Sequence, residues 1–152
     1  LLRFFNGDFY EYKSFISNKF WNYDVEDNAF ALMRDKNGVI ASIHSTATQW
    51  RHKFRIEITT KQALIELKGI LSGSKSYGKE SLRIIKRSQK SLNGYKIKSQ
   101  YYFNKDNSWK EEIDEFANII LEKLPVKTGN IFDALKVMDM VEKIYHADKK
   151  GI

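Results

Sequence analysis

The chain has 152 residues, of which 30% are charged and 42% hydrophobic, a balance typical of one folded globular domain. It contains no cysteine, which excludes disulfides and thiolate-bound metals and favours a cytoplasmic location, and its three histidines match no zinc-binding spacing. The formal net charge is +7, and no apolar run approaches the roughly 18 residues of a membrane span. We therefore expect neither a metal site nor a membrane partner.

The first residues resemble the last turns of an amphipathic helix. Leu1-Leu2-Arg3-Phe4-Phe5 has the required apolar residues, and Gly7 stands where a glycine commonly ends a helix. Because the chain holds an end but no beginning for this helix, the sequence predicts a piece of a longer protein, cut inside the helix.

Strand patterns fill the next two-thirds of the chain. Segments of alternating apolar and polar residues are separated by short polar turns, of which Asn37-Gly38 and Asn93-Gly94 are typical of tight hairpins. Consecutive strands joined by such short turns pair antiparallel. The predicted strands are residues 10–17, 26–34, 39–48, 54–59, 63–68, 82–87 and 95–103.

Two helices follow the strands. Ser108 and Glu111 have the spacing of a capping box, and the apolar positions then recur every three or four residues until Pro125. Asn130 predicts the start of a second helix with one apolar stripe. The sequence thus predicts an α+β fold with an open, largely antiparallel sheet, helices packed on one face, and a single domain over residues 1–152.

The face of the sheet opposite the helices is not uniformly polar. Ile43, Ile56 and Ile65 alternate with polar residues along their strands and place apolar side chains on it. An exposed apolar sheet face is a self-association surface, so we expect a homo-oligomer that assembles sheet to sheet.

Residues 73–80, GSKSYGKE, have the G-x-x-x-x-G-K spacing of a phosphate-binding loop. Such a loop needs a hydroxyl after its lysine, and Glu80 places a carboxylate there instead. It must also join a strand to a helix, whereas residues 81–87 read as a strand. We interpret the stretch as a glycine-rich turn between strands, with no cofactor-binding residue in it.

Motifs of catalysis are missing from the sequence, which has no G-x-S-x-G, H-E-x-x-H or G-x-G-x-x-G pattern. Functional side chains concentrate at His44, Gln49 and Trp50, near the end of a predicted strand. Stacking by a tryptophan and hydrogen bonds from a glutamine suit a polyhydroxylated ligand. A structural histidine and a core or interface tryptophan are the alternative, and the sequence leaves both open.

Positive charge gathers between Lys61 and Lys105, where eleven Lys or Arg stand against two Glu. The chain could therefore be a basic α+β module that binds nucleic acid or a protein partner. Lys96 and Lys98 alternate with Tyr95 and Ile97, which favours a solvated face of a strand. We expect no specific nucleic-acid binding.

Several short motifs, in order along nearly the whole chain, resemble the C-terminal domain of the glucose-fructose oxidoreductase/inositol dehydrogenase (Gfo/Idh/MocA) family. The resemblance covers the segments Val25–Phe30 (VEDNAF), Ile43–Trp50 (IHSTATQW), Phe54–Glu57 (FRIE), Ser76–Glu80 (SYGKE) and Asp133–Met138 (DALKVM).

This resemblance implies one half of an NAD(P)-dependent oxidoreductase that acts on sugars, inositols or related polyols. The half implied here forms the substrate pocket wall and the oligomer interface, with His44, Gln49, Trp50 and, from the glycine-rich turn, Tyr77 as substrate-binding candidates. The Rossmann domain that binds NAD or NADP, the catalytic lysine and the H-x-x-D motif would precede Leu1. No catalytic residue is expected in this chain, which alone should bind no dinucleotide. Ala47 departs from the larger residue expected in close relatives.

Overall fold

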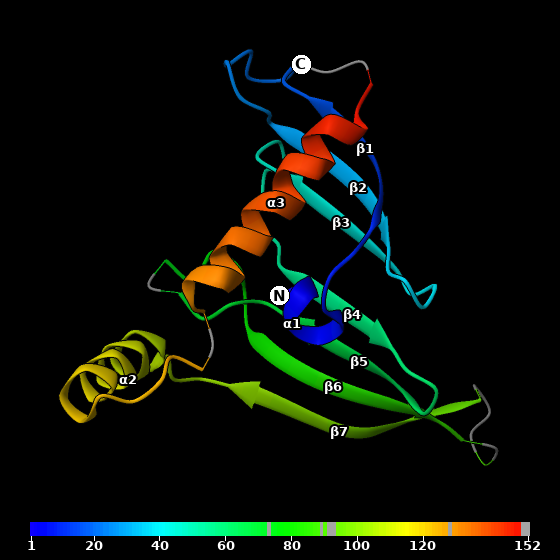
Figure 1. Ribbon diagram of the computed structural model, residues 1–152. Coiled ribbons are helices and arrows are strands. Elements are labelled where there is room, and N and C mark those ends of the chain that lie inside the picture. Colours follow the sequence, from blue (N-terminus) through cyan, green and yellow to red (C-terminus); the bar gives the residue numbers. More distant parts are fainter. Residues whose placement is uncertain (73, 89, 91–93, 128, 150–152) are drawn as a thin grey trace. The chain divides into compact units, whose positions relative to one another are not determined.

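The computed structural model describes residues 1–72, 74–88, 90, 94–127 and 129–149, and its elements are labelled in Figure 1. Two compact units are distinguished: unit 1 comprises Leu1–Gln49 and the C-terminal part from Leu124, and unit 2 comprises Trp50–Lys123. The elements in chain order are α1 (Leu2–Asn6), β1 (Glu11–Ser17), β2 (Asn28–Arg34), β3 (Ile40–Thr46), β4 (Arg55–Thr59), β5 (Ala63–Lys68), β6 (Glu80–Arg87), β7 (Tyr95–Phe103), α2 (Ser108–Glu122) and α3 (Ile131–Ala147).

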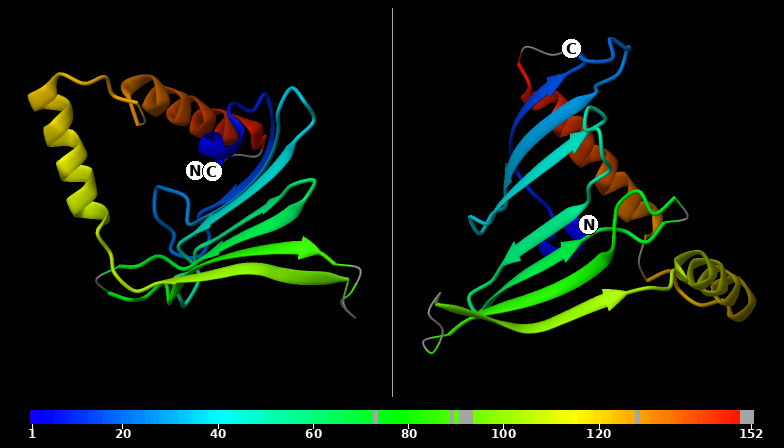
Figure 2. Two further views of the ribbon diagram at one scale, coloured as in Figure 1. Left: turned by 90° about the horizontal axis from the view of Figure 1, so that it is seen from below. Right: turned by 180° about the vertical axis from the view of Figure 1, so that it is seen from behind.

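Unit 1 is a three-stranded antiparallel sheet, in the order β1-β2-β3, with α3 lying along one of its faces (Figures 1 and 2). Alternation along β2 places Ala31 and Met33 on the covered side, where they are 3% and 1% exposed. Phe9, just before β1, is also buried. The hydroxyl of Ser14 donates to the Ile144 carbonyl, which joins β1 to α3. An apolar centre therefore holds this unit together.

The opposite face of the same sheet is open to solvent and carries large apolar side chains beside the exposed ion pair of Arg34 and Glu11. Phe15 is 79% exposed, and Leu32 and Ile40 are more than half exposed. Phe15 pairs with Phe30, which in turn pairs with His44 across β3. This surface is called here the outer face. The residues predicted for an exposed apolar face lie elsewhere: Ile43 pairs with the buried Ala31 and so lies on the side covered by α3, while Ile56 and Ile65 belong to the second sheet.

The hairpin between β2 and β3 confirms the turn predicted at Asn37-Gly38. Gly38 has a φ of 84°, a left-handed conformation that glycine adopts without strain. The buried carboxylate of Asp35 accepts hydrogen bonds from the backbone N–H groups of Asn37 and Val39, both at 2.8 Å. Local turn chemistry thus sets the register of the two strands.

Unit 2 contains a four-stranded antiparallel sheet in the order β4-β5-β6-β7. One of its faces carries half-buried isoleucines and leucines that lie opposite one another, such as Ile58, Ile65 and Ile84. The other face carries charged residues in the corresponding row, Glu57, Glu66 and Arg83. The strand alternation expected from the sequence is confirmed, with β6 beginning at Glu80 rather than at Leu82.

A buried carboxylate occupies the middle of the charged face. The side chain of Glu66 is 6% exposed and is surrounded by three cations, which we call the Glu66 hub. Lys68 Nζ and Arg83 Nη1 lie 2.9 Å from its oxygens, and Arg55 Nη2 lies 3.1 Å away. The hydrogen bond from Lys68 and the nearby positive charges hold the pKa of Glu66 below its usual value.

The two long helices begin differently. Asn130 caps α3, since its side-chain oxygen accepts a hydrogen bond from the Asp133 N–H at 3.0 Å, as expected. The capping box predicted for α2 is wrong, because its N-cap residue is Asn107 and no side chain caps it. Ser108 instead donates from both its N–H and its hydroxyl to Asp106, two residues earlier in the chain. None of the residues of α2 is buried.

The described residues confirm the α+β class and the antiparallel pairing, and Gly7 ends α1 with a φ of 83°. The strands are divided between two sheets, of three and four strands. The single domain expected over residues 1–152 stays a prediction. The turn expected at Asn93-Gly94 falls partly outside the described residues.

Candidate functional site

His44 packs on the outer face of unit 1. Its ring is stacked on Phe30, with centroids 3.8 Å apart and planes inclined by 11°. Its Nε2 lies 2.9 Å from Oδ1 of Asn28. Both contacts come from β2, so the structure gives this imidazole a place within the sheet, while its contact with a substrate stays a prediction.

Gln49 and Trp50 follow the end of β3. Gln49 belongs to unit 1 and Trp50 to unit 2, so the candidate segment crosses the boundary between the two units. The indole of Trp50 is 94% exposed, the highest value among the exposed large hydrophobic side chains of the described residues. A tryptophan this exposed has no role in the core of its unit, and the interface role and the contact with a substrate both stay open.

Tyr77 is in contact with a residue that the sequence did not single out. Its ring centroid lies 4.9 Å from that of His52, and Nδ1 of His52 lies 2.8 Å from the hydroxyl of Ser76. These contacts join the segment before β4 to the loop between β5 and β6, both within unit 2. His52 stands only two residues after Trp50, and this proximity was the one signal that could have pointed to it.

Hydroxyl groups extend this contact into a chain. Ser72 and Ser74 lie 3.2 Å apart, Ser74 and Ser76 lie 2.8 Å apart, and His52 follows at 2.8 Å. Each hydroxyl can donate or accept, so the direction of the whole chain of hydrogen bonds can reverse. The three hydroxyls come from alternate residues in an S-x-S-x-S spacing, from which no function was predicted.

The base of the loop between β5 and β6 is closed by backbone contacts. Gly69 has a φ of 73°, and a Cβ at this position would lie 2.3 Å from the Lys79 carbonyl oxygen, so only glycine fits. The carboxylate of Glu80 accepts a hydrogen bond from the Leu71 N–H at 2.9 Å. The loop joins strand to strand, as expected for a turn that does not bind phosphate in the manner of a P-loop. Gly73 lies outside the described residues.

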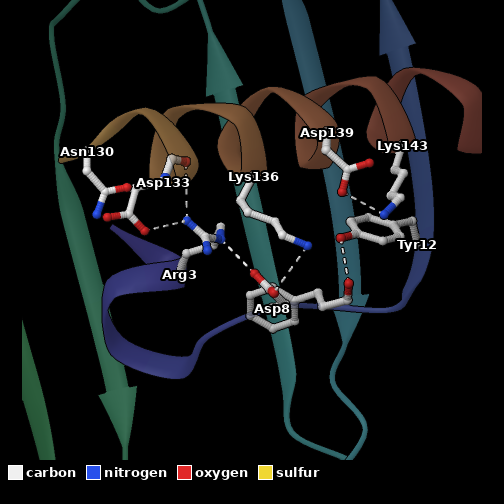
Figure 3. Close-up of polar contacts among 9 residues, drawn as sticks. Arg3, Asp8, Tyr12, Asn130, Asp133, Lys136, Asp139 and Lys143 are labelled. Atoms are coloured by element: carbon white, nitrogen blue, oxygen red, sulfur yellow. Dashed lines mark hydrogen bonds and ion pairs between the residues drawn. The ribbon is translucent and has the colours of Figure 1, made fainter. Parts of the chain in front are cut away.

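Charged residues also connect the elements of unit 1 (Figure 3). Arg3 of α1 donates to Asp8 at 2.8 Å and to the carbonyl oxygen of Asp133 in α3 at 3.3 Å. Lys136 Nζ lies 3.8 Å from the second oxygen of Asp8. The hydrogen bond from Arg3 lowers the pKa of the Asp8 carboxyl. These contacts fasten the N-terminal helix to α3.

A small cavity lies beside these ion pairs, lined by Arg3, Tyr12 and Lys143 among others. Its volume is about 60 Å³, room for one or two water molecules, whereas small-molecule sites usually measure roughly 300–1,000 Å³. Its charges are already paired, as in the bond of 2.7 Å between Lys143 and Asp139. The cluster is therefore a structural fastening rather than a ligand site.

Two classes of site are absent from the part of the chain that the structure describes. It brings together no group of three or more His, Cys, Asp or Glu that could hold a metal ion. Within the same residues, every helix is too short or too polar to cross a membrane.

No family model and no curated protein matches the sequence. Solved structures do match. A protein from Desulfitobacterium hafniense assigned as an NADPH-dependent oxidoreductase is similar over 98% of this chain, with a TM-score of 0.77 and 14% identity. Levoglucosan dehydrogenase in complex with NADH and levoglucosan is similar over 97%, with a TM-score of 0.72 and 14% identity.

A third similar structure is UDP-N-acetylglucosamine 3-dehydrogenase from Acidithiobacillus ferrooxidans, with 78% of this chain covered, a TM-score of 0.62 and 18% identity. The chain spans 43%, 45% and 36% of these three proteins, in the order given. All three are oxidoreductases of the type that the sequence motifs resemble. At such low identity the similarity shows the fold, and the fold that the resemblance implied is confirmed.

Proposed function

We propose that this chain is the substrate-binding and oligomerisation domain of an NAD(P)-dependent oxidoreductase that acts on a sugar, inositol or related polyol. The observation that carries the proposal is the fold, shared over 98% of the chain with an oxidoreductase of more than twice its length. The names of the other two similar structures, both sugar dehydrogenases, support the substrate class.

In this proposal the chemistry is divided between two parts of the enzyme. NAD or NADP binds to a separate dinucleotide-binding part, since the sequence of this chain lacks the G-x-G-x-x-G turn whose N–H groups meet the pyrophosphate. The acid and base that move the carbinol proton belong to that other part as well. This chain contributes the wall against which the substrate is held and oriented.

Trp50 is the strongest candidate in that wall. Its exposed indole offers an apolar face on which the C–H side of a sugar ring can stack, and Gln49 next to it can bond to hydroxyls. Tyr77 offers a second ring, 36% exposed. His44, in unit 1, is a separate candidate, and its Nε2 lies 2.9 Å from Oδ1 of Asn28.

Assembly is the second role. The outer face of unit 1 presents Phe15, Phe30, Leu32 and Ile40 to solvent, and a second copy of the chain is the occupant we propose for it. Light scattering at micromolar concentration should show a dimer or tetramer. Phe15→Lys should shift the chain to a monomer, whereas Lys13→Gln on the same strand should not, and a wild-type monomer would contradict this role.

The substrate role is tested in the complete enzyme with Trp50→Ala. We expect kcat/KM to fall by about 10-fold, or roughly 1.4 kcal/mol, with the affinity for the dinucleotide nearly unchanged. Trp109→Ala is the matched control, because Trp109 lies on α2 and is 76% exposed. Unaltered kinetics of Trp50→Ala would remove Trp50 from the substrate wall.

The proposal that the dinucleotide binds outside this chain is tested separately. NADH titrated into the 152-residue chain at about 0.15 M salt should show no saturable change in fluorescence, because physiological salt screens attraction to scattered cations. Saturable binding in the micromolar range would contradict the proposal that the dinucleotide binds elsewhere.

A further inference from the structure

Two loops of unit 2 form a surface rich in positive charge. They are residues 50–54, before β4, and residues 69–72 and 74–79, between β5 and β6, called here the two-loop surface. One carboxylate, that of Glu80 just after the second loop, reaches it and accepts a hydrogen bond from the Leu71 N–H. Nδ1 of His52 and the hydroxyl of Ser76 connect the loops, as does the Gly69 N–H, which donates to the Phe54 carbonyl at 3.1 Å. The surface is thus a defined arrangement within one unit.

Four cations stand on this surface: Arg51, Lys53, Lys75 and Lys79. All four are exposed, and neither loop contains an aspartate or glutamate in the residues considered. Eight other lysines and arginines of the described residues form ion pairs with carboxylates, whereas none of these four does so within the described residues. Unpaired like charges repel one another, so an anion that binds here is stabilised by the cations that it approaches.

Neutral groups lie among these cations. The chain of serine hydroxyls ends on Nδ1 of His52, which leaves Nε2 of the same ring without a partner among the described residues. Tyr77 packs against that ring and adds a half-exposed aromatic face. Groups that can both donate and accept, next to an aromatic face, match the alternating hydroxyls and C–H face of a sugar ring.

We propose that the two-loop surface binds a sugar or cyclitol that carries a negatively charged group, either a phosphate or a carboxylate. His52 Nε2 and the serine chain hydrogen-bond to ring hydroxyls, Tyr77 packs on the ring, and the cations hold the charged group. This inference rests on the proposed function and narrows its substrate class from sugars, inositols and related polyols in general to those that carry a negative charge. It also adds His52 to the residues that contact the substrate.

Four probes separate the contributions of the ring and of the charge. D-Glucose, glucose 6-phosphate, D-glucuronate and inorganic phosphate are titrated into the 152-residue chain, with binding followed by saturation-transfer NMR and calorimetry. We expect one or both charged sugars to bind about 10-fold or more tighter than glucose and than phosphate alone, and the advantage to shrink when the salt is raised from about 0.15 M to about 1 M. The phosphate and carboxylate arms identify which acidic group is preferred.

Variants connect the binding to the named residues. His52→Ala should weaken the charged sugars about 10-fold, and His52→Gln, which keeps a hydrogen-bonding side chain, should restore part of the loss. The double variant Lys53→Gln/Lys79→Gln should bring the charged sugars close to the affinity of glucose. Lys61→Gln is the matched control, because it removes one exposed cation from the β4–β5 turn, at the opposite end of the same hairpin. Circular dichroism establishes that each variant folds.

Different results would contradict the anionic substrate class and the proposed function. Glucose and the charged sugars binding equally well would overturn the anionic class and leave the polyol-binding role intact. Inorganic phosphate binding as tightly as glucose 6-phosphate, or charged sugars unaffected by His52→Ala, would also overturn it. Failure of the chain to bind any of the sugars would overturn the two-loop surface as a binding site, whereas the proposed function itself is contradicted by unaltered kinetics of Trp50→Ala in the complete enzyme. Tighter, salt-dependent binding of single-stranded DNA would favour a basic nucleic-acid-binding module in place of both.

Discussion

The two units of this chain are built around opposite kinds of centre. In unit 1 the most deeply buried apolar side chains are Phe9, Ala31 and Met33, each at most 3% exposed. In unit 2 the corresponding position is taken by the carboxylate of Glu66, and its isoleucines and leucines are only half-buried in the described residues. Apolar burial depends little on pH, whereas a carboxylate held by cations depends on its charge. The two units should therefore differ in what destabilises them.

The largest expected effect is at the apolar centre. Met33 is the largest fully buried side chain of the described residues, at 1% exposed, and Met33→Ala should lower the free energy of unfolding by about 3 kcal/mol through lost burial and a residual cavity. Hydrogen exchange should accelerate in the amides of β2 and leave those of β5 protected. Equal acceleration of exchange in both strands would show that the two units unfold together, which would contradict the difference expected between them.

Glu66→Gln should have the next largest effect. It leaves Arg55, Lys68 and Arg83 close together without the carboxylate between them. Removing one partner of a fully buried ion pair costs roughly 3–5 kcal/mol, and because these cations are 27–43% exposed we expect about 2 kcal/mol. The β5 amides should now exchange faster while the β2 amides do not, which chemical denaturation and exchange would measure.

Acid should reproduce part of that loss in the wild-type chain. The pKa of Glu66 is lowered in the folded chain relative to the usual value of 4.5, so the unfolded chain takes up the proton more readily. The stabilisation is fully present above about pH 4.5 and disappears as the pH falls through the folded pKa. The difference in unfolding free energy between wild type and Glu66→Gln should therefore narrow below that pH.

The difference between wild type and Met33→Ala should stay constant over the same range, since no charge is involved. A gap between wild type and Glu66→Gln that is unchanged down to about pH 3 would show that the carboxylate's charge does not stabilise unit 2.

The smallest effect belongs to Glu57→Gln, the control for the hub. Glu57 also pairs with Arg55, but both side chains are 43% exposed. We expect a change within about 0.5 kcal/mol, because solvent screens such a pair and both side chains lose freedom in forming it. If Glu57→Gln lowered the free energy of unfolding as much as Glu66→Gln does, the charge on this face, rather than the burial of Glu66, would decide the stability of unit 2.

Much of the fold followed from local patterns. The hairpin at Asn37-Gly38, the helix start at Asn130 and the helix end at Gly7 depend on the backbone preferences of a few adjacent residues, and all three predictions are confirmed. The capping box at Ser108 failed because the Ser108 N–H, which the box would direct to the Glu111 carboxylate, donates to the carboxylate of Asp106 instead. A pattern of residue types does not show which of two nearby acceptors is used.

The candidate site was less predictable. Trp50 and Tyr77 were chosen for their chemistry, and their exposure agrees with that choice without testing contact with a substrate. His52 was missed, since its contacts with Ser76 and Tyr77 join residues 24 and 25 positions away in the sequence. The alternation of apolar and polar residues along β5 indicates on which face of the sheet Glu66 lies. It does not indicate that Glu66 is buried.

The sequence by itself determined the strand and helix segments, the antiparallel pairing of neighbours and the sites of the tight turns, because these depend on interactions within a few residues. Only the tertiary structure decided that Glu66 is the centre of unit 2, since Arg55, Lys68 and Arg83 reach it from three different strands. It likewise decided that Gly69 must be glycine, because the Lys79 carbonyl lies where a side chain would begin. Burial and close approach between distant segments are properties of the packed chain, which no local pattern contains.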